Sequence, residues 1–206
     1  MITVHHLNNS RSQRILWLLE ELGLPYALKI YQRDATTNLA PPELSAVHPL
    51  GKSPMIEDDG TLVVESGAIV EYLCARHGPH LLPAPDSPEH TRHLELMHFA
   101  EGSAMTPILL ALYVGRLGEA GAPLAPRIEH QLHSHFAYME SQLRPSGHFV
   151  LDDLSAADIM LSFPAEVAIA QGHGARYPGL ARFVAESQAR PAYRRGLEKG
   201  GPYRFA

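Results

Sequence analysis

The stretch from Val47 to Ser66 constrains the fold most, because it predicts a loop, a β-hairpin and the start of a helix in direct succession. Its centre, Asp58-Asp59-Gly60, favours a tight turn, since Asp and Gly tolerate the positive φ angles of such turns. The apolar residues Thr61–Val64 then predict the second hairpin strand. Apolar residues recur at helical spacing from Ala68 onward, so Ser66 is predicted as the N-cap of the next helix.

The same stretch carries groups that suit a small charged ligand. A cis peptide bond before Pro54 would turn the backbone N–H and C=O of Ser53 outward, toward a molecule lying alongside. The helix start at Ser66 offers free N–H groups and a hydroxyl for a carboxylate, and the preceding Glu65 could hold an ammonium. Together these groups describe a pocket for a small peptide. An ordinary hairpin followed by a capped helix is equally compatible with the pattern.

The residues from His48 to Ile69 resemble the glutathione-binding half of the glutathione S-transferase superfamily. That family carries N-P-x-G-x-x-P before its hairpin and E-S at the next helix start; here H-P-L-G-K-S-P ends at Pro54 and E-S-G-A-I begins at Glu65. The opening H-H-L-N-N-S-R-S, the capping box at Leu154–Ile159 and R-P-A-Y at Arg190–Tyr193 also resemble family motifs. The resemblance covers the whole chain and points to a serine-type cytosolic member of bacterial or fungal kind.

The chain divides by pattern into an α/β half and a helical half. Strands are predicted at Ile2–Leu7 and Tyr26–Tyr31, joined through a helix by a right-handed crossover. Only helices are expected in the second half, and Pro107 is predicted to kink the first of them. The expected architecture is a thioredoxin-like, glutathione-binding α/β domain at residues 1–78, a proline-rich linker at 79–87 and an all-α domain at 88–206.

A second local signal lies in the helical half. Ser155 and Asp158 have the spacing of a capping box, in which each side chain bonds the backbone N–H of the other residue. Leu154 can pack on Ile159 as a hydrophobic staple. We interpret this motif as a folding element rather than a catalytic one.

The resemblance implies that reduced glutathione is the co-substrate. Glu65 would hold the γ-glutamyl ammonium, and Ser66 the γ-glutamyl carboxylate. The backbone of Ser53 would pair with the cysteinyl part as a short β-addition, and Lys52 would reach the glycyl carboxylate, with His48 as the weaker candidate. His48 and Ser53 depart from the family's usual Asn and branched apolar residue. The expected glutathione-binding residues are His48, Lys52, Ser53, Pro54, Glu65 and Ser66.

The turn after the first strand is where the resemblance places thiol activation. Members of the family use a tyrosine, serine or cysteine there, and this chain has no tyrosine before Tyr26 and no cysteine before Cys74. Ser10 at the helix N-terminus matches the catalytic serine best, with Asn9 and Ser12 as fallbacks. A free thiol has a pKa near 8.5, so little of it is ionised at pH 7. A hydrogen bond from a hydroxyl and the positive end of a helix would both stabilise the thiolate.

The resemblance also implies sites that involve the helical domain. An electrophile pocket is expected between the domains, with Met105, Leu109, Leu112 and Tyr113 on its wall. Glu101 of a neighbouring subunit could approach the γ-glutamyl ammonium, which presupposes the homodimer common in the family. The expected partners are therefore glutathione, a small hydrophobic electrophile and a second copy of the chain.

Bulk composition excludes several other classes. With 17 basic against 22 acidic residues the net charge is −5, which argues against nucleic-acid binding. A single cysteine, Cys74, and the lack of a membrane span or secretion signal favour a cytoplasmic protein. His5 and His6 point to opposite faces of a strand, so no metal site is expected. The alternatives to a transferase are a glutathione-dependent peroxidase or disulfide reductase, and a non-catalytic protein that binds glutathione or apolar ligands.

Overall fold

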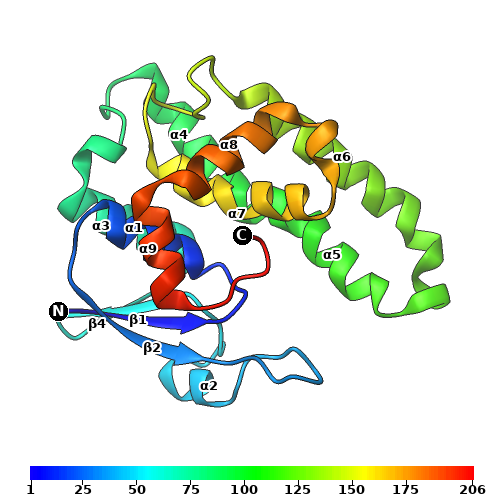
Figure 1. The fold of residues 1–206 in the computed structure, drawn as a ribbon, viewed down its shortest axis with the longest axis horizontal. Helices are drawn as coiled ribbons and strands as arrows, with labels where there is room; N and C mark the ends of the chain where they lie inside the picture. The colour runs from blue at the N-terminus through cyan, green and yellow to red at the C-terminus, as the bar shows by residue number, and fades with distance from the viewer. The chain divides into compact units, whose positions relative to one another are not determined.

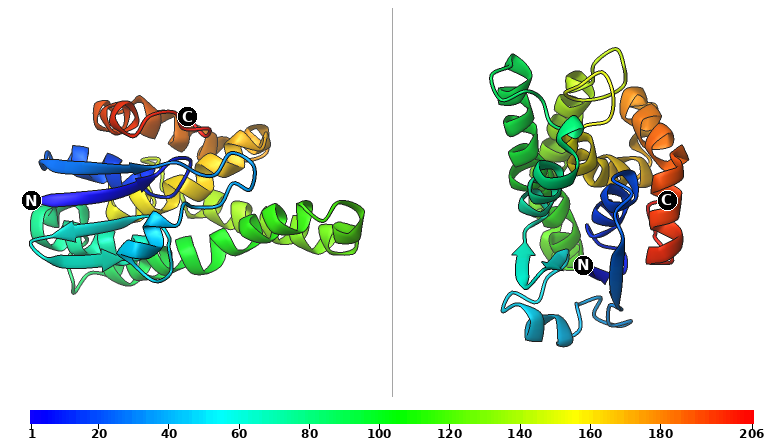
Figure 2. Two further views of the ribbon diagram at one scale, coloured as in Figure 1. Left: turned by 90° about the horizontal axis from the view of Figure 1, so that it is seen from below. Right: turned by 90° about the vertical axis from the view of Figure 1, so that its left-hand side faces the viewer.

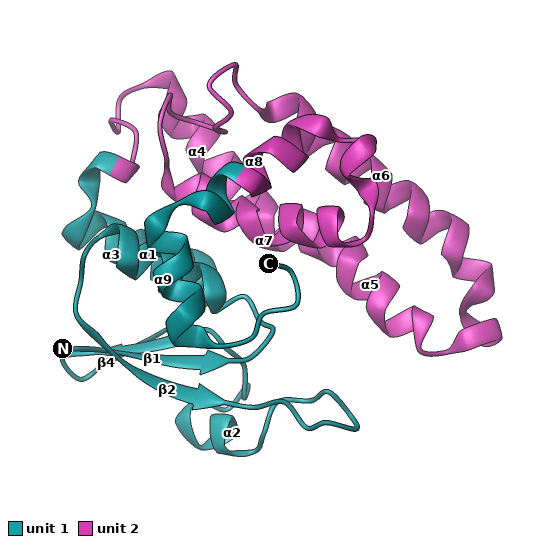
Figure 3. Cartoon of the chain, in the orientation of Figure 1, with its two compact units in different colours: residues 1–80, 186–206 teal, residues 81–185 magenta.

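The computed structural model describes residues 1–206 and divides the chain into two compact units. Unit 1 comprises residues 1–80 and 186–206, and unit 2 comprises residues 81–185 (Figure 3). The first boundary falls inside the segment predicted as a linker. The second boundary differs from the predicted helical domain at 88–206, because residues 186–206 belong to unit 1. There α9 (Pro191–Gly200) packs against α1 (Gln13–Glu21).

Unit 1 is built on a four-stranded sheet in the order β2-β1-β3-β4. Strand β2 runs parallel to β1, Val4 lying opposite Leu28, whereas β3 is antiparallel to both β1 and β4. The turn between β3 and β4 places Asp59 and Gly60 at φ angles of 46° and 81°, which confirms the predicted hairpin. The strands are β1 (Ile2–Leu7), β2 (Tyr26–Tyr31), β3 (Met55–Asp58) and β4 (Thr61–Val64).

Helices cover both faces of this sheet, because successive side chains of β1 point to opposite faces and pack against different helices. Leu7 packs with Leu44 of α2 (Glu43–Val47) and with Met55 on one face. On the other face His6 lies against Gly200 of α9. Within unit 1, Figure 1 shows α1, α9 and α3 (Ser66–His77) on one side of the sheet and α2 on the other. A short 3-10 helix, Pro79–Leu81, follows α3.

Helix α9 is fixed to α1 by carboxylates that meet basic side chains. Glu20, nearly buried, accepts hydrogen bonds from Arg195 Nε at 2.8 Å, from Lys199 and from the Tyr26 hydroxyl. Glu21 pairs with Arg190 in the same way. Figure 2 shows the two helices side by side in its right-hand view. These groups give the last segment of the chain its place in unit 1.

A glycine of α9 permits the close approach of the two helices. A Cβ atom at Gly196 would lie 3.1 Å from the Trp17 backbone nitrogen and 3.2 Å from the Leu16 carbonyl carbon. Because both contacts are backbone atoms, neither can turn aside. A side chain at this crossing would therefore require the backbone of α1 to shift by a few tenths of an ångström.

We expect Gly196→Ala to lower the free energy of unfolding by about 1 kcal/mol. Overpacking by a methyl group costs about 1–3 kcal/mol, and the better helix propensity of alanine returns up to about 1 kcal/mol. Urea denaturation measures the change. The control is Gly115→Ala on α5, where a Cβ atom meets nothing within 4 Å and the same propensity gain should appear alone. Equal effects of the two substitutions would contradict the close-packing account.

Unit 2 is helical, as predicted for this part of the chain. The predicted kink near Pro107 takes the form of a π-helical turn, Ala100–Ala104, between α4 and α5. Proline removes the N–H that would bond the carbonyl one turn back and its ring pushes that carbonyl away, which widens the preceding turn. The further elements are α4 (Pro88–Phe99), α5 (Met105–Gly115), a 3-10 helix (Gly118–Leu124), α6 (Ala125–Gln142), α7 (Ala156–Ala170), a 3-10 turn (His173–Ala175) and α8 (Pro178–Ala189), the last crossing the boundary between the units.

The capping box is present at the start of α7. Ser155 N–H donates to Asp158 Oδ2 at 2.7 Å, and Asp158 N–H donates to Ser155 Oγ at 3.4 Å. Asp158 also accepts from the Phe149 N–H at 2.9 Å, so it ties the preceding loop to the helix. The motif is thus a folding element of unit 2. None of the helices has both the length and the apolar character to cross a membrane.

Candidate functional site

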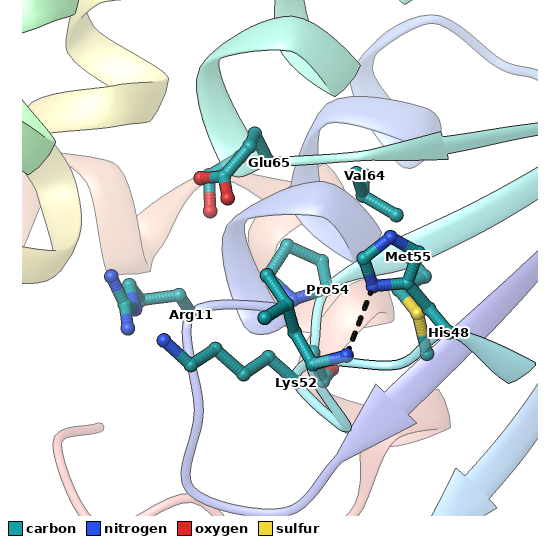
Figure 4. A pocket seen from close by; sticks show the side chains of 10 residues that line it. Arg11, His48, Lys52, Pro54, Met55, Val64 and Glu65 are labelled. Atoms are coloured by element: carbon teal, nitrogen blue, oxygen red, sulfur yellow. Dashed lines mark hydrogen bonds between the residues drawn. The ribbon is translucent and has the colours of Figure 1, made fainter. Parts of the chain in front are cut away.

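Unit 1 contains a pocket between the carboxyl end of β1, the cis-Pro54 segment and the start of α3. It encloses about 480 Å³ including its open mouth. Figure 4 shows the side chains that surround it. The lining residues are Arg11, His48, Leu50, Lys52, Ser53, Pro54, Met55, Val64, Glu65 and Ser66. The pocket therefore brings together the six residues expected to bind glutathione and adds Arg11, which was not among the predicted site residues.

Ser53 joins the pocket to the first strand. The Ser53–Pro54 peptide bond is cis, which is the condition under which the Ser53 backbone was expected to face a ligand. The Ser53 hydroxyl donates to the His5 carbonyl at 2.8 Å and accepts from the Leu7 N–H at 3.2 Å. This explains a serine where a branched apolar residue is usual, because the side chain is bonded to β1 and the backbone is left to border the pocket.

The start of α3 supplies the electrostatic character of the upper wall. Ser66 is buried and is the first helical residue, whereas Glu65 occupies the N-cap position at a φ of 70°. The prediction that Ser66 is the N-cap is therefore wrong by one residue, because the positive φ of Glu65 turns the chain directly after the strand and makes Ser66 the first helical residue. The first-turn N–H groups of the helix begin at the pocket, where they favour an anionic group.

Three charged side chains converge on the open side of the pocket. Figure 4 shows the Arg11 guanidinium and the Lys52 ammonium directed to the same space, with the Glu65 carboxylate above them. Glu65 and Lys52 are exposed and Arg11 is half-buried. His48 Nδ1 accepts from the Leu50 N–H at 3.4 Å, so the ring's other nitrogen is its donor when the imidazole is neutral. The charges suit a ligand with both anionic and cationic groups.

A hydrogen-bonded chain stabilises the loop between β1 and α1. Ser10 Oγ lies 2.7 Å from Ser12 Oγ, which lies 2.8 Å from Nδ1 of His6. Burial lowers the pKa of His6 to about 4, so the ring is neutral at pH 7, and its other nitrogen bonds the Gly200 backbone. That tautomer makes Nδ1 an acceptor, so Ser12 donates to His6 and Ser10 donates to Ser12.

The three residues considered for thiol activation do not line the pocket. Ser10 is 5% exposed and its hydroxyl is engaged with Ser12. Ser12, not Ser10, is the N-cap of α1, and Asn9 accepts from the Arg204 N–H at 2.9 Å. A catalytic role of Ser10, Asn9 or Ser12 stays a prediction. Arg11 is the residue of this loop that reaches the pocket, and a pattern based on hydroxyl and thiol side chains could not indicate it.

The remaining predicted residues lie in unit 2. Glu101 is on the π-helical turn, and the four electrophile-pocket residues are on α5. Met105 is buried, Leu109 is half-buried, and Leu112 and Tyr113 are exposed. Their roles stay predictions. Cys74 lies buried in α3, and burial raises the pKa of its thiol to about 12, which suits a core residue rather than a nucleophile.

Comparison with known proteins defines the class to which this fold and pocket belong. Residues 1–75 match the model of the glutathione S-transferase N-terminal domain. Glutathione S-transferase 3 of Schizosaccharomyces pombe is 34% identical over 97% of this chain and 88% of its own length. A crystal structure of a glutathione S-transferase from Actinobacillus pleuropneumoniae, 33% identical, superposes with a TM-score of 0.88 over 97% of this chain and 93% of that one.

A more distant structure shares the fold. A glutathione transferase homologue from Sulfitobacter with bound glutathione is 21% identical, with a TM-score of 0.82 over 97% of this chain and 98% of that one. The class is that of thioredoxin-like α/β proteins followed by helices, with the architecture of cytosolic glutathione transferases. The chain belongs to the glutathione S-transferase family and is an enzyme of the transferase class.

Proposed function

We propose that the pocket of unit 1 binds reduced glutathione and that the enzyme conjugates its thiolate to small hydrophobic electrophiles. The observation that carries the proposal is the convergence of Arg11, Lys52 and Glu65 beside the Ser53 backbone and the start of α3. Glutathione has one ammonium, two carboxylates and a thiol along an extended tripeptide. The glutathione bound in the Sulfitobacter homologue supports the same ligand for this pocket.

Each part of glutathione has a partner of matching chemistry. Glu65 holds the γ-glutamyl ammonium, and the first N–H groups of α3 with the Ser66 hydroxyl hold the adjacent carboxylate. The backbone of Ser53 pairs with the cysteinyl residue as an added strand. Lys52 binds the glycyl carboxylate, with the His48 ring as a secondary donor.

The reaction is a nucleophilic displacement or addition. The glutathione thiol loses its proton to solvent, and its sulfur forms a bond to the electrophilic carbon. In a displacement, the leaving group departs with the electron pair of the broken bond. In an addition to an epoxide or enal, that electron pair goes to the oxygen or the α-carbon, which takes up a proton from solvent. Lowering the thiol pKa from about 8.5 by about two units requires roughly 2.7 kcal/mol of preferential thiolate stabilisation. A hydrogen bond to a charged group is worth about 1.5–3 kcal/mol, so one such contact from the β1–α1 loop has about the required size. A homodimer in the cytoplasm is the setting that the family resemblance favours.

Replacing Glu65 tests the assigned ligand. We expect Glu65→Gln to weaken glutathione binding about tenfold or more, because a hydrogen bond to a charged group is worth about 1.5–3 kcal/mol. Isothermal titration calorimetry measures the affinity. Glu71→Gln, an exposed carboxylate on the same helix α3 that does not line the pocket, is the matched control and should bind as the wild type does.

Turnover of a nitro-activated aryl halide, followed as absorbance of the thioether product, tests the reaction itself. Glutathione binding without turnover of halide, epoxide or enal probes would contradict the proposed conjugating activity but not the proposed binding site. Unaltered affinity in Glu65→Gln would instead contradict the placement of the ligand in this pocket.

A further inference from the structure

We infer that Arg11, rather than a hydroxyl of the β1–α1 loop, is the residue that binds and stabilises the glutathione thiolate. This inference rests on the proposed function, because it assigns one contact of the proposed ligand. It follows from three features: where the cysteinyl residue would lie, how the loop is held, and how the charges of pocket and ligand match. Each can be followed in the contacts of unit 1.

The position of Ser53 places the thiol beside the loop. Because the Ser53 hydroxyl is bonded to His5 and Leu7 at the end of β1, the loop that leaves β1 borders the same backbone. A cysteinyl residue paired with Ser53 therefore projects its side chain along this border. Arg11 is the loop residue that lines the pocket there. Its guanidinium shares the open side of the pocket with Lys52 (Figure 4).

The loop is held so that Arg11, and not Ser10, faces the ligand. The Ser10 hydroxyl donates to Ser12 Oγ and accepts from the Ser12 N–H at 3.2 Å, and Ser12 is bonded to the buried His6. A thiolate needs a donor, and the single proton of the Ser10 hydroxyl is directed to Ser12. We therefore assign Ser10 and Ser12 as positioning residues that fix the backbone on either side of Arg11.

Contacts from elsewhere in unit 1 stabilise the loop further. The Arg33 N–H donates to Asn8 Oδ1 at 2.7 Å, and the Arg204 N–H donates to Asn9 Oδ1 at 2.9 Å. The carbonyl of Asn8 accepts from Arg33 Nε at 3.1 Å. A loop tied at Asn8, Asn9, Ser10 and Ser12 presents the residue between the last two in a fixed direction.

The charges of the pocket match the thiolate form of glutathione when Arg11 is included. Glu65 pairs with the ammonium, the start of α3 with one carboxylate and Lys52 with the other, and Arg11 lines the same pocket as a further cation beside the developing anion. Arginine stays protonated throughout the range in which a thiol titrates, so its stabilisation of the thiolate does not fade with pH. It also presents several N–H donors to one sulfur, which a hydroxyl cannot do.

The test separates the thiolate from the rest of the ligand. Ultraviolet absorbance of bound glutathione between pH 5 and 9 gives the thiol pKa, and calorimetry with S-methylglutathione, which has no ionisable thiol, gives the affinity for everything else. We expect Arg11→Gln to raise the bound thiol pKa by at least one unit, which is about a tenfold loss of thiolate at pH 5. Its affinity for S-methylglutathione should stay within about threefold of the wild type. Arg11→Lys should recover part of the pKa shift.

Three results would overturn the inference. Equal weakening of glutathione and S-methylglutathione by Arg11→Gln would make Arg11 a carboxylate ligand. A larger rise of the thiol pKa in Ser10→Ala than in Arg11→Gln would return the role to the hydroxyl. An unchanged thiol pKa in Arg11→Gln would remove Arg11 from activation. Absence of glutathione binding by the wild type would refute the proposed function itself, a result distinct from any of these. Circular dichroism of each variant confirms that the fold is retained.

Discussion

Asp158→Ala is expected to lower the free energy of unfolding by about 3 kcal/mol, the largest effect of a single substitution foreseen outside the pocket. The carboxylate is completely buried and accepts from Phe149 N–H at 2.9 Å, Ser155 N–H at 2.7 Å and Ser155 Oγ at 2.5 Å. Alanine leaves these buried donors without acceptors, and each orphaned group costs about 1–3 kcal/mol. The expected loss is smaller than the sum of these costs, because water can bond the freed N–H groups if the start of α7 moves toward the surface.

Urea denaturation of three variants tests this account. Asp158→Asn keeps the shape but turns an N–H₂ group toward a backbone N–H, so it should also be clearly destabilised. Asp152→Ala is the control: its side chain is 82% exposed and pairs with Arg144 at the surface, where ion pairs contribute about 0–1 kcal/mol. A loss in Asp158→Ala no larger than in Asp152→Ala would contradict the role of the capping box.

Lowering the pH from 7 to 4 is expected to destabilise the fold through two buried histidines. Burial lowers the pKa of His6 in unit 1 and of His93 in unit 2 to about 4 from the usual 6.5. The Gly200 backbone opposes this shift at His6. At His93, the neighbouring His90 adds to the shift and Asp158 opposes it. Both rings are almost inaccessible, with 2% and 3% exposure.

The sign follows from where protons bind. Between pH 6.5 and 4 the unfolded chain takes up a proton at each histidine and the folded chain does not, so stability falls as the pH falls. The loss begins near pH 6.5 and levels off below pH 4. It amounts to roughly 3 kcal/mol for each histidine, because one pKa unit corresponds to about 1.4 kcal/mol.

Urea denaturation at pH 7, 6, 5 and 4 measures the slope. His93→Leu, which removes one of the two groups, should reduce the pH dependence by about half. His80→Gln, at an exposed position, should leave it unchanged. A slope that survives removal of His93 in full would show that other groups carry the acid sensitivity.

Much of unit 1 could be predicted because its signals are local. The strand Thr61–Val64 and the turn before it follow from β-branched side chains and from Asp-Gly, whose preferences act within a few residues. The helix Ser66–His77 follows from apolar spacing, and the capping box at Ser155 from two polar side chains three residues apart. These elements depend on preferences that act within a few residues, which is why the sequence pattern indicated them.

Other features depend on contacts between distant segments. The placement of residues 186–206 in unit 1 depends on Glu20 and on the absence of a side chain at Gly196, neither of which marks a partner in the sequence. The N-cap of α3 was mispredicted for a local reason, because Glu65 has a positive φ that is uncommon for glutamate. Arg11 could not be predicted as a pocket residue, because an arginine in a loop is usually solvated. Its place in the pocket depends on the hydrogen bond that holds Ser53 to β1.

The assembly of unit 1 from both ends of the chain has a consequence for synthesis on the ribosome. The sheet, α1 and α3 emerge first, but Gly200, which bonds His6, and Arg204, which bonds Asn9, emerge only after the whole of unit 2. Residues 81–185 can complete unit 2 in the interval. The loop that carries Arg11 therefore acquires its hydrogen bond to Arg204 only after residues 81–185 have been synthesised.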